Sequence, residues 1–200
     1  PVPRPAFRPS PPAAARLAAI DPRPPVSPGA LCGDARLRGA AAPAPRTANG
    51  CGIERPVRIE AVAGVALDPP PVVDCAVASR LADWLQAVVQ PAARAETGAS
   101  VTGLRVFAGY ACRGRNNQRM ARMSLHGRGL AIDIGGFRLS DGRQAAVLEG
   151  WRGADAAFLR RAWRGACGPF GTVLGPNADR WHANHFHLDV ADYRSGPVCR

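Results

Sequence analysis

The fold prediction starts from two segments, Ser124-Leu-His126-Gly-Arg-Gly129-Leu-Ala131-Ile-Asp133 and, far downstream, His182-Ala-Asn-His185-Phe-His187-Leu-Asp189. All four histidines of the chain lie in these segments. Side chains of an extended strand alternate between the two faces of a sheet. The second segment therefore places His185, His187 and Asp189 on one face and its apolar residues on the other.

The same alternation in the first segment directs Leu130, Ile132 and Ile134 to the core and Asp133 to the opposite face. Small residues flank Asp133 on that face, which leaves open space beside its carboxylate. The two segments are thus predicted to be strands that bury one apolar side and present a carboxylate and imidazoles on the other.

Elsewhere, alternation and β-branched residues predict strands at 57–62, 101–107 and 172–174, besides those at 130–134 and 185–190. Asp74 can cap a helix whose apolar positions follow the 3.6-residue repeat until Pro91 ends or kinks it. A second helix at 152–166 is predicted to pack through Phe158, Leu159 and Trp163. The expected fold class is α+β, with a small central antiparallel sheet that carries the site, flanked by helices.

Residues 1–28 contain ten prolines among Arg and Ala, a composition that cannot bury a core. We expect a flexible tether there and one domain at 29–200. No uninterrupted run of 18 apolar residues occurs, so we expect no transmembrane segment.

The net charge of +11 is carried by arginine, since all 26 basic residues are Arg. A basic surface attracts polyanions in general. The arginines are scattered and accompany no recognised binding motif, so we expect no specific nucleic-acid partner.

Six cysteines, spread along the chain without a C-x-x-C pair, favour a disulfide-stapled protein in an oxidising compartment. A chain that starts at Pro1 also fits a precursor whose signal peptide has been removed, so we expect a periplasmic or extracellular location. The alternative is six buried thiols in a cytosolic protein. Pairing of sequence neighbours predicts the bridges Cys32 to Cys51, Cys75 to Cys112 and Cys167 to Cys199.

An open space walled by one carboxylate and several imidazoles is what a catalytic zinc site needs, because three protein ligands leave a fourth position for water. Two neutral His and one Asp leave a site with net positive charge, which lowers the pKa of bound water to about 7 and polarises a peptide carbonyl. The spacing differs from H-E-x-x-H, which excludes a helix-borne metalloprotease site.

This pattern resembles the zinc peptidases grouped with D-Ala-D-Ala peptidases, lysostaphin and hedgehog, and more closely the bacterial extensin-like C-terminal domain family. The resemblance spans roughly residues 30–200. It rests on Tyr110-Ala-Cys-Arg113, Ser124-Leu-His126, Gly129-Leu-Ala-Ile-Asp133, Phe158-Leu159, Ala166-Cys167, Val173-Leu-Gly-Pro176 and His185-Phe-His-Leu-Asp189.

The resemblance implies that His126, Asp133 and His187 are the Zn²⁺ ligands and that His185 lies beside the metal-bound water. It also implies that Arg113 holds substrate or a developing oxyanion, a task that suits a planar guanidinium. A surface arginine is the alternative for Arg113. Many relatives carry Asp or Glu three residues before the last ligand, where this chain has Asn184, and an amide cannot act as a base.

Proton transfer is therefore expected to fall to His185, with His182 as relay. An exposed loop histidine is the alternative for His182. Ser124 is expected to cap or turn the ligand loop, Asp189 to orient a neighbouring His or Arg, and Trp181 to wall the substrate or pack.

We expect a monomeric, secreted zinc metallopeptidase, a hydrolase acting on peptidoglycan stem peptides or cross-links of the cell wall. The alternative is a catalytically weak or inactive zinc-containing module that binds the wall.

Overall fold

The structure is a computed structural model that describes residues 30–45, 50–115, 118 and 121–200. The expected tether at 1–28 lies outside the described residues. The strands are β1 (Leu37–Ala41), β2 (Pro56–Val62), β3 (Val65–Asp68), β4 (Val72–Asp74), β5 (Val101–Ala108), β6 (Ala131–Leu139), β7 (Gln144–Ala146), β8 (Thr172–Leu174), β9 (Phe186–Asp189) and β10 (Val198–Cys199). The α-helices are α1 (Cys75–Trp84), α2 (Gln90–Thr97), α3 (Val147–Gly150) and α4 (Ala156–Ala166), and shorter helical turns are η1 (Leu31–Gly33), η2 (Leu85–Val89) and η4 (Leu125–Arg128).

The ten strands of the described residues belong to one sheet with the order β1-β2-β3-β5-β6-β9-β8-β10, to which β4 adds beside β2 and β7 beside β6. Most pairs are antiparallel, but β3 pairs with β5, and β8 with β10, in parallel. The expected small antiparallel sheet is therefore corrected to a large mixed one. The sequence-based prediction lacks five of these strands, β1, β3, β4, β7 and β10. Each is only two to five residues long, which is too short for a clear alternation of apolar and polar residues.

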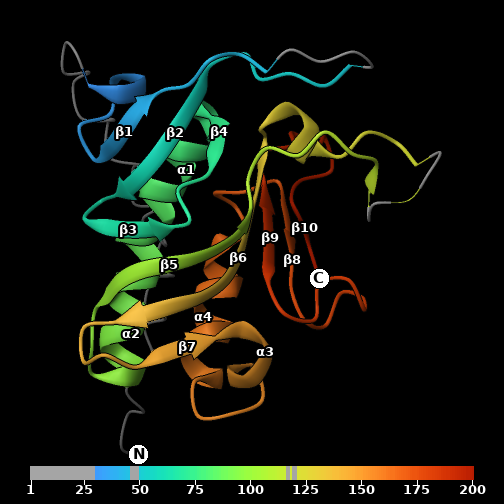
Figure 1. The fold of residues 1–200 in the computed structure, drawn as a ribbon. Coiled ribbons are helices and arrows are strands. Elements are labelled where there is room, and N and C mark those ends of the chain that lie inside the picture. The colour runs from blue at the N-terminus through green and yellow to red at the C-terminus, as the bar shows by residue number, and fades with distance from the viewer. Residues whose placement is uncertain (1–29, 46–49, 116–117, 119–120) are drawn as a thin grey trace, which may run out of the picture.

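Figure 1 shows α1, α2 and α4 behind the sheet, so that one face is covered by helices and the other is open. The core fills the space between sheet and helices, and its largest fully buried side chains include Trp84, Phe137, Phe158, Phe170 and Phe186. The Trp84 indole is also satisfied, since its Nε1 donates to the carbonyl of Ala162 at 3.0 Å. The apolar sides of β6 and β9 pack into this core.

The first helical segment begins as predicted, because the Asp74 side chain accepts a hydrogen bond from the Ala76 amide at 2.9 Å. Of the two outcomes predicted at Pro91, an end to the helix is wrong. Helical structure continues through the π-helical turn η2 and on to Thr97, and Pro91 lies in the first turn of α2. The left-handed Gly98 ends the segment.

The second helix is shorter than predicted, since residues 152–155 form turns and α4 begins at Ala156. It packs as expected, with Phe158 and Leu159 fully buried and Trp163 partly buried against the core. Strand β6 extends beyond its predicted end at 134 to Leu139, with a register shift against β5 where Gly135 is inserted.

Three disulfides staple the domain, Cys32–Cys75, Cys51–Cys112 and Cys167–Cys199. The predicted pairing of neighbours is right for Cys167–Cys199 and wrong for the other two. The chain folds back so that η1 meets the start of α1, and the 50–52 turn meets the loop after β5, placing cysteines 43 and 61 residues apart side by side. Within the described ranges, no helix is long and apolar enough to cross a membrane.

Candidate metal centre

Two of the expected ligands lie opposite each other on paired strands. Asp133 of β6 and His187 of β9 are register partners, and the neighbouring pairs are Ile132 with Leu188 and Ile134 with Phe186. Those four apolar residues are fully buried in the core, which commits Asp133 and His187 to the open face. The alternation read from the sequence is therefore present, and the antiparallel ladder fixes the two side chains side by side.

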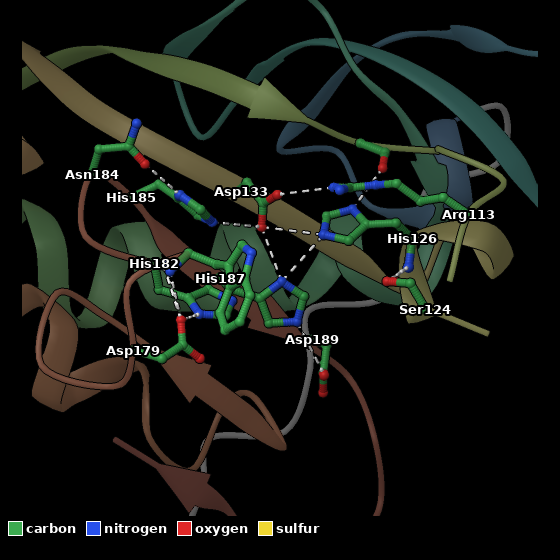
Figure 2. Close-up of polar contacts among 12 residues, drawn as sticks. Arg113, Ser124, His126, Asp133, Asp179, His182, Asn184, His185, His187 and Asp189 are labelled. Atoms are coloured by element: carbon green, nitrogen blue, oxygen red, sulfur yellow. Dashed lines mark hydrogen bonds and ion pairs between the residues drawn. The ribbon is translucent and has the colours of Figure 1, made fainter. Parts of the chain in front are cut away.

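The third expected ligand, His126, comes from the short 3₁₀ turn η4. Ser124 begins this turn, and its Oγ accepts a hydrogen bond from the His126 amide at 3.4 Å. Gly129 ends it with a φ of 66°, in the left-handed region that glycine adopts at low cost. The turn aims the buried His126 ring at Asp133 and His187, as Figure 2 shows. Ser124 thus supports the loop that carries His126.

The three side chains meet at one point. The Asp133 Oδ1 lies 3.2 Å from the His126 Nε2 and 2.9 Å from the His187 Nδ1. The two ring nitrogens are 3.2 Å apart. Each residue offers one ligand atom, and all three atoms lie within 4.8 Å of one another. A tetrahedron built on zinc–nitrogen bonds of 2.0–2.1 Å has edges of about 3.3 Å, which is close to these separations.

The far nitrogen of each imidazole is bound to an acceptor, which settles where the lone pair of each ring points. The His126 Nδ1 donates to the carbonyl of Gly109 at 2.7 Å, and the His187 Nε2 donates to the Asp189 carboxylate at 3.3 Å. When the two rings are neutral, their other nitrogens carry lone pairs that face the Asp133 oxygen. Three acceptors this close repel one another unless a cation lies among them, so the residues present fit a metal of zinc's kind.

Without a metal, a proton can serve as that cation. Burial opposes charge on His187, but hydrogen bonds and charge attraction from Asp133 and Asp189 outweigh it and raise the pKa of His187 to about 9. Burial likewise opposes ionisation of Asp133, but hydrogen bonds from His126 and His187 hold its pKa well below the ordinary range. The carboxylate is therefore ionised at neutral pH, and metal binding must displace the proton on His187.

Two further residues that were expected at the site, His185 and Arg113, approach the Asp133 carboxylate. The His185 Nε2 is 3.6 Å from Oδ1, and the Arg113 Nη2 is 3.9 Å from Oδ2. The Asn184 side-chain oxygen accepts from the His185 Nδ1 at 2.9 Å, so the free nitrogen of His185 faces the cluster. Burial lowers the pKa of His185 to about 4, which keeps this ring neutral at neutral pH.

His182 lies in the loop that approaches β9, and its ring centroid is 5.2 Å from that of His185. It is buried rather than exposed, and its Nδ1 donates to the Asp179 carboxylate at 2.7 Å. Trp181 is 40% exposed beneath the Arg180 guanidinium, at the rim of the site. Trp181 is therefore a solvent-facing indole rather than part of the core.

Sequence reasoning missed two partners. Asp179 precedes His182 by three residues, a spacing that could have suggested the pair, whereas the Gly109 carbonyl carries no side-chain signal. The cluster opens into a cavity of about 350 Å³, and Thr172, Trp181 and Tyr193 are among the residues that line it with the four histidines.

Comparison with known protein families finds a match for residues 30–200, to the family described as extensin-like protein C-terminus. No curated protein and no solved structure matches the chain.

Proposed function

The chain belongs to the family of extensin-like protein C-termini, and from this premise and the site geometry we propose that it is an exported zinc peptidase of bacterial cell-wall peptides. The observation that carries the proposal is the convergence of three lone-pair donors, the nitrogens of His126 and His187 and an oxygen of Asp133, at 2.9–3.2 Å. Three disulfides are compatible with an exported protein.

His126, Asp133 and His187 would hold the ion. Zinc bound there would act as a Lewis acid, which would polarise a peptide carbonyl and lower the pKa of a bound water to about 7. Since both imidazoles are fixed through their far nitrogens, the ligand atoms need little reorganisation to bind. The cavity beside them leaves room for a peptide bond and one water.

His185 would act as the general base. Its Nε2 faces the cluster, its Nδ1–H is held by Asn184, and its low pKa leaves the ring unprotonated at neutral pH. His182, oriented by Asp179, lies next to it and could pass the proton onward. Arg113 would stabilise negative charge on the carbonyl oxygen or bind a substrate carboxylate.

One observation favours a second candidate, a zinc-containing module that binds the wall without cleaving it. The partner of His185 is the neutral amide of Asn184, which orients the ring without raising its basicity as a carboxylate would. A base with a pKa of about 4 is weak, which favours binding without cleavage.

The experiment that separates the two candidates is digestion of purified sacculi by the zinc-loaded protein, followed by mass spectrometry of the muropeptides. A peptidase releases new peptide ends, and both a chelated sample and His187→Ala protein should release none. If the muropeptides stay unchanged while the protein co-sediments with sacculi, the binding module is the correct function.

A further inference from the structure

A second cavity, of about 470 Å³, lies on the open face of the sheet where β3, β5, β6 and β7 run side by side. We call it the β5–β6 groove and define it by Gly103, Arg105, Phe107, Gly136, Arg138 and Gln144. The metal centre uses none of these residues, although β6 carries both the groove and Asp133.

Two guanidinium groups and one aromatic ring give the groove its chemistry. Arg105 lies over the Phe107 ring, 5.2 Å from its centroid, and both side chains are exposed. Arg138 lies across Gly103, where an added Cβ would come within 2.6 Å of its guanidinium. Among the described residues, neither arginine has a carboxylate within 4.0 Å, although Asp68 of β3 also lines the groove and is the register partner of Arg105.

The groove is continuous with the metal centre. The Phe107 ring centroid is 6.1 Å from that of His185, and His185 in turn lies 3.6 Å from Asp133. The Arg105 guanidinium lies 5.2 Å from the same Phe107 centroid. The first cation of the groove is therefore no more than about 11 Å from the His185 ring, a span of about three residues of extended peptide.

We propose that the β5–β6 groove binds the continuation of the substrate and selects extended peptides that carry a carboxylate about three residues from the scissile bond. The proposal rests on the proposed function and deepens it. A substrate as short as a single stem tripeptide leaves the groove empty, whereas a cross-linked pair of stem peptides fills it. The geometry thus assigns the protein to long, acidic substrates.

A peptide suits the groove better than other polyanions do. The groove contains two cations, Arg105 and Arg138. Phe107 offers an apolar surface between Arg105 and His185 of the candidate metal centre. A nucleic acid or an acidic polysaccharide would instead require a longer row of cations, spaced to match its repeated charges.

The test measures binding, so that it does not depend on turnover. Fluorescein-labelled cross-linked stem-peptide dimer, the same dimer with its carboxylates amidated, and a stem tripeptide are titrated in the cold into zinc-loaded protein. The double variant Arg105→Gln/Arg138→Gln is compared with Arg152→Gln/Arg164→Gln, which removes the same charge from exposed positions outside the groove. Zinc content and melting temperature show that each variant is folded and loaded.

We expect the groove variant to bind the free-carboxylate dimer about tenfold more weakly, the scale of two exposed ion pairs, and the control variant to match wild type. Binding of the amidated dimer and the tripeptide should be unchanged by either variant. Equal loss in both variants, or equal binding of free and amidated dimer by wild type, would overturn the proposal. Competition by polygalacturonate that matches the dimer and needs the same arginines would overturn the peptide as occupant.

The two proposals fail separately. Arginine-dependent binding of the dimer without any cleavage of sacculi would remove the peptidase and keep the groove. Cleavage of sacculi by wild type and by the groove variant at the same rate would keep the peptidase and remove the groove.

Discussion

Two of the three side chains of the candidate metal centre lie on strands and the third lies on a loop, and the two regions are held in different ways. Asp133 and His187 face each other across an antiparallel ladder whose other side is packed into the core. His126 belongs to the turn η4, which is held by the Ser124 cap and by a 2.8 Å hydrogen bond from the Gly52 amide to the Gly127 carbonyl, beside the Cys51–Cys112 bridge. The strand pair is fixed by cooperative packing, whereas the loop depends on a few separable contacts.

The largest expected effect comes from breaking the strand pair. His187→Ala removes one of three ligands, and the protein should lose bound zinc on dialysis and, with it, all peptidase activity. Elemental analysis of the dialysed variant measures this, with His182→Ala as the control that keeps all three ligands. Full zinc occupancy in His187→Ala would show that the ligand set is wrong.

The approach to β9 is a third region, because His185 precedes the strand and touches the centre without being needed to hold the metal. His185→Ala should keep its zinc and lose roughly 10²- to 10⁴-fold in rate, the usual range for a removed acid or base. Initial rates on sacculi and zinc content are measured on the same preparation.

Asn184→Asp offers the matched gain, since a carboxylate at this position both holds the ring and raises its basicity. We expect its rate to equal or exceed that of wild type. A fully active His185→Ala together with a strongly activated Asn184→Asp would mark the native protein as a weakened enzyme.

Removing the Cys51–Cys112 bridge tests the loop. The double variant Cys51→Ser/Cys112→Ser should lose about 4 kcal/mol of unfolding free energy, as expected for a closed loop of this length. It should also bind zinc more weakly, because the segment that carries His126 gains freedom when unbound.

The Cys167–Cys199 bridge joins the residue after α4 to β10 and does not tie down η4, so it serves as the control. Its removal should cost a similar stability, again about 4 kcal/mol, and leave zinc affinity unchanged in a folded sample. Chemical denaturation and competition with a zinc chelator measure the two quantities. Equal zinc affinity in both variants would show that the loop is held without its disulfide.

The pH dependence of stability sharpens the account of the strand pair. The pKa of His187 is raised to about 9 in the folded metal-free protein, so its contribution is complete below its ordinary pKa of 6.5 and is lost as pH rises through 9. The pKa of Asp133 is lowered, so its contribution is present above 3.8 and is lost as pH falls below that value.

The metal-free protein should therefore melt at a lower temperature at about pH 9 than at about pH 6. Zinc competes with the proton on His187, so its stabilisation should grow over the same interval. Calorimetry with and without chelator measures both. A metal-free melting temperature that is flat across the interval would contradict the His187–Asp133 pairing.

The smallest expected effect is that of Ser124→Ala. Loss of the cap should cost about 1 kcal/mol of stability and weaken zinc binding slightly, since η4 keeps its other contacts. Ser195→Ala, at an exposed position, is the control and should change neither quantity.

Elements with a repeating pattern of apolar residues could be predicted from the sequence. Contacts between segments that are distant in the sequence could not. Alternation in 130–134 and 185–190 placed Asp133 and His187 on one open face, and the 3.6-residue repeat after Asp74 located the main helix. The family resemblance added His126, whose 3₁₀ turn has no periodicity of its own. The pairing of Cys51 with Cys112 depends on how the strands between them are ordered, which local pattern does not encode.

The short length of the remaining strands explains why they were not predicted. Strands of two to five residues at the two ends of the sheet span barely one period of alternation, so their neighbours in the sheet decide their conformation. Asp179 lay in a loop whose shape follows from the packing around His182.

The two imidazole ligands differ in how far mutation can tune them. The His187 ring donates a hydrogen bond to the Asp189 side chain, which a single substitution can neutralise or remove. His126 leans on the main-chain oxygen of Gly109, which every residue possesses, and a side chain at 109 would come within 2.7 Å of the Val72 carbonyl. Substitution at 189 can therefore change the electron density on the His187 ring, whereas the acceptor that orients His126 stays the same whatever residue replaces its neighbours.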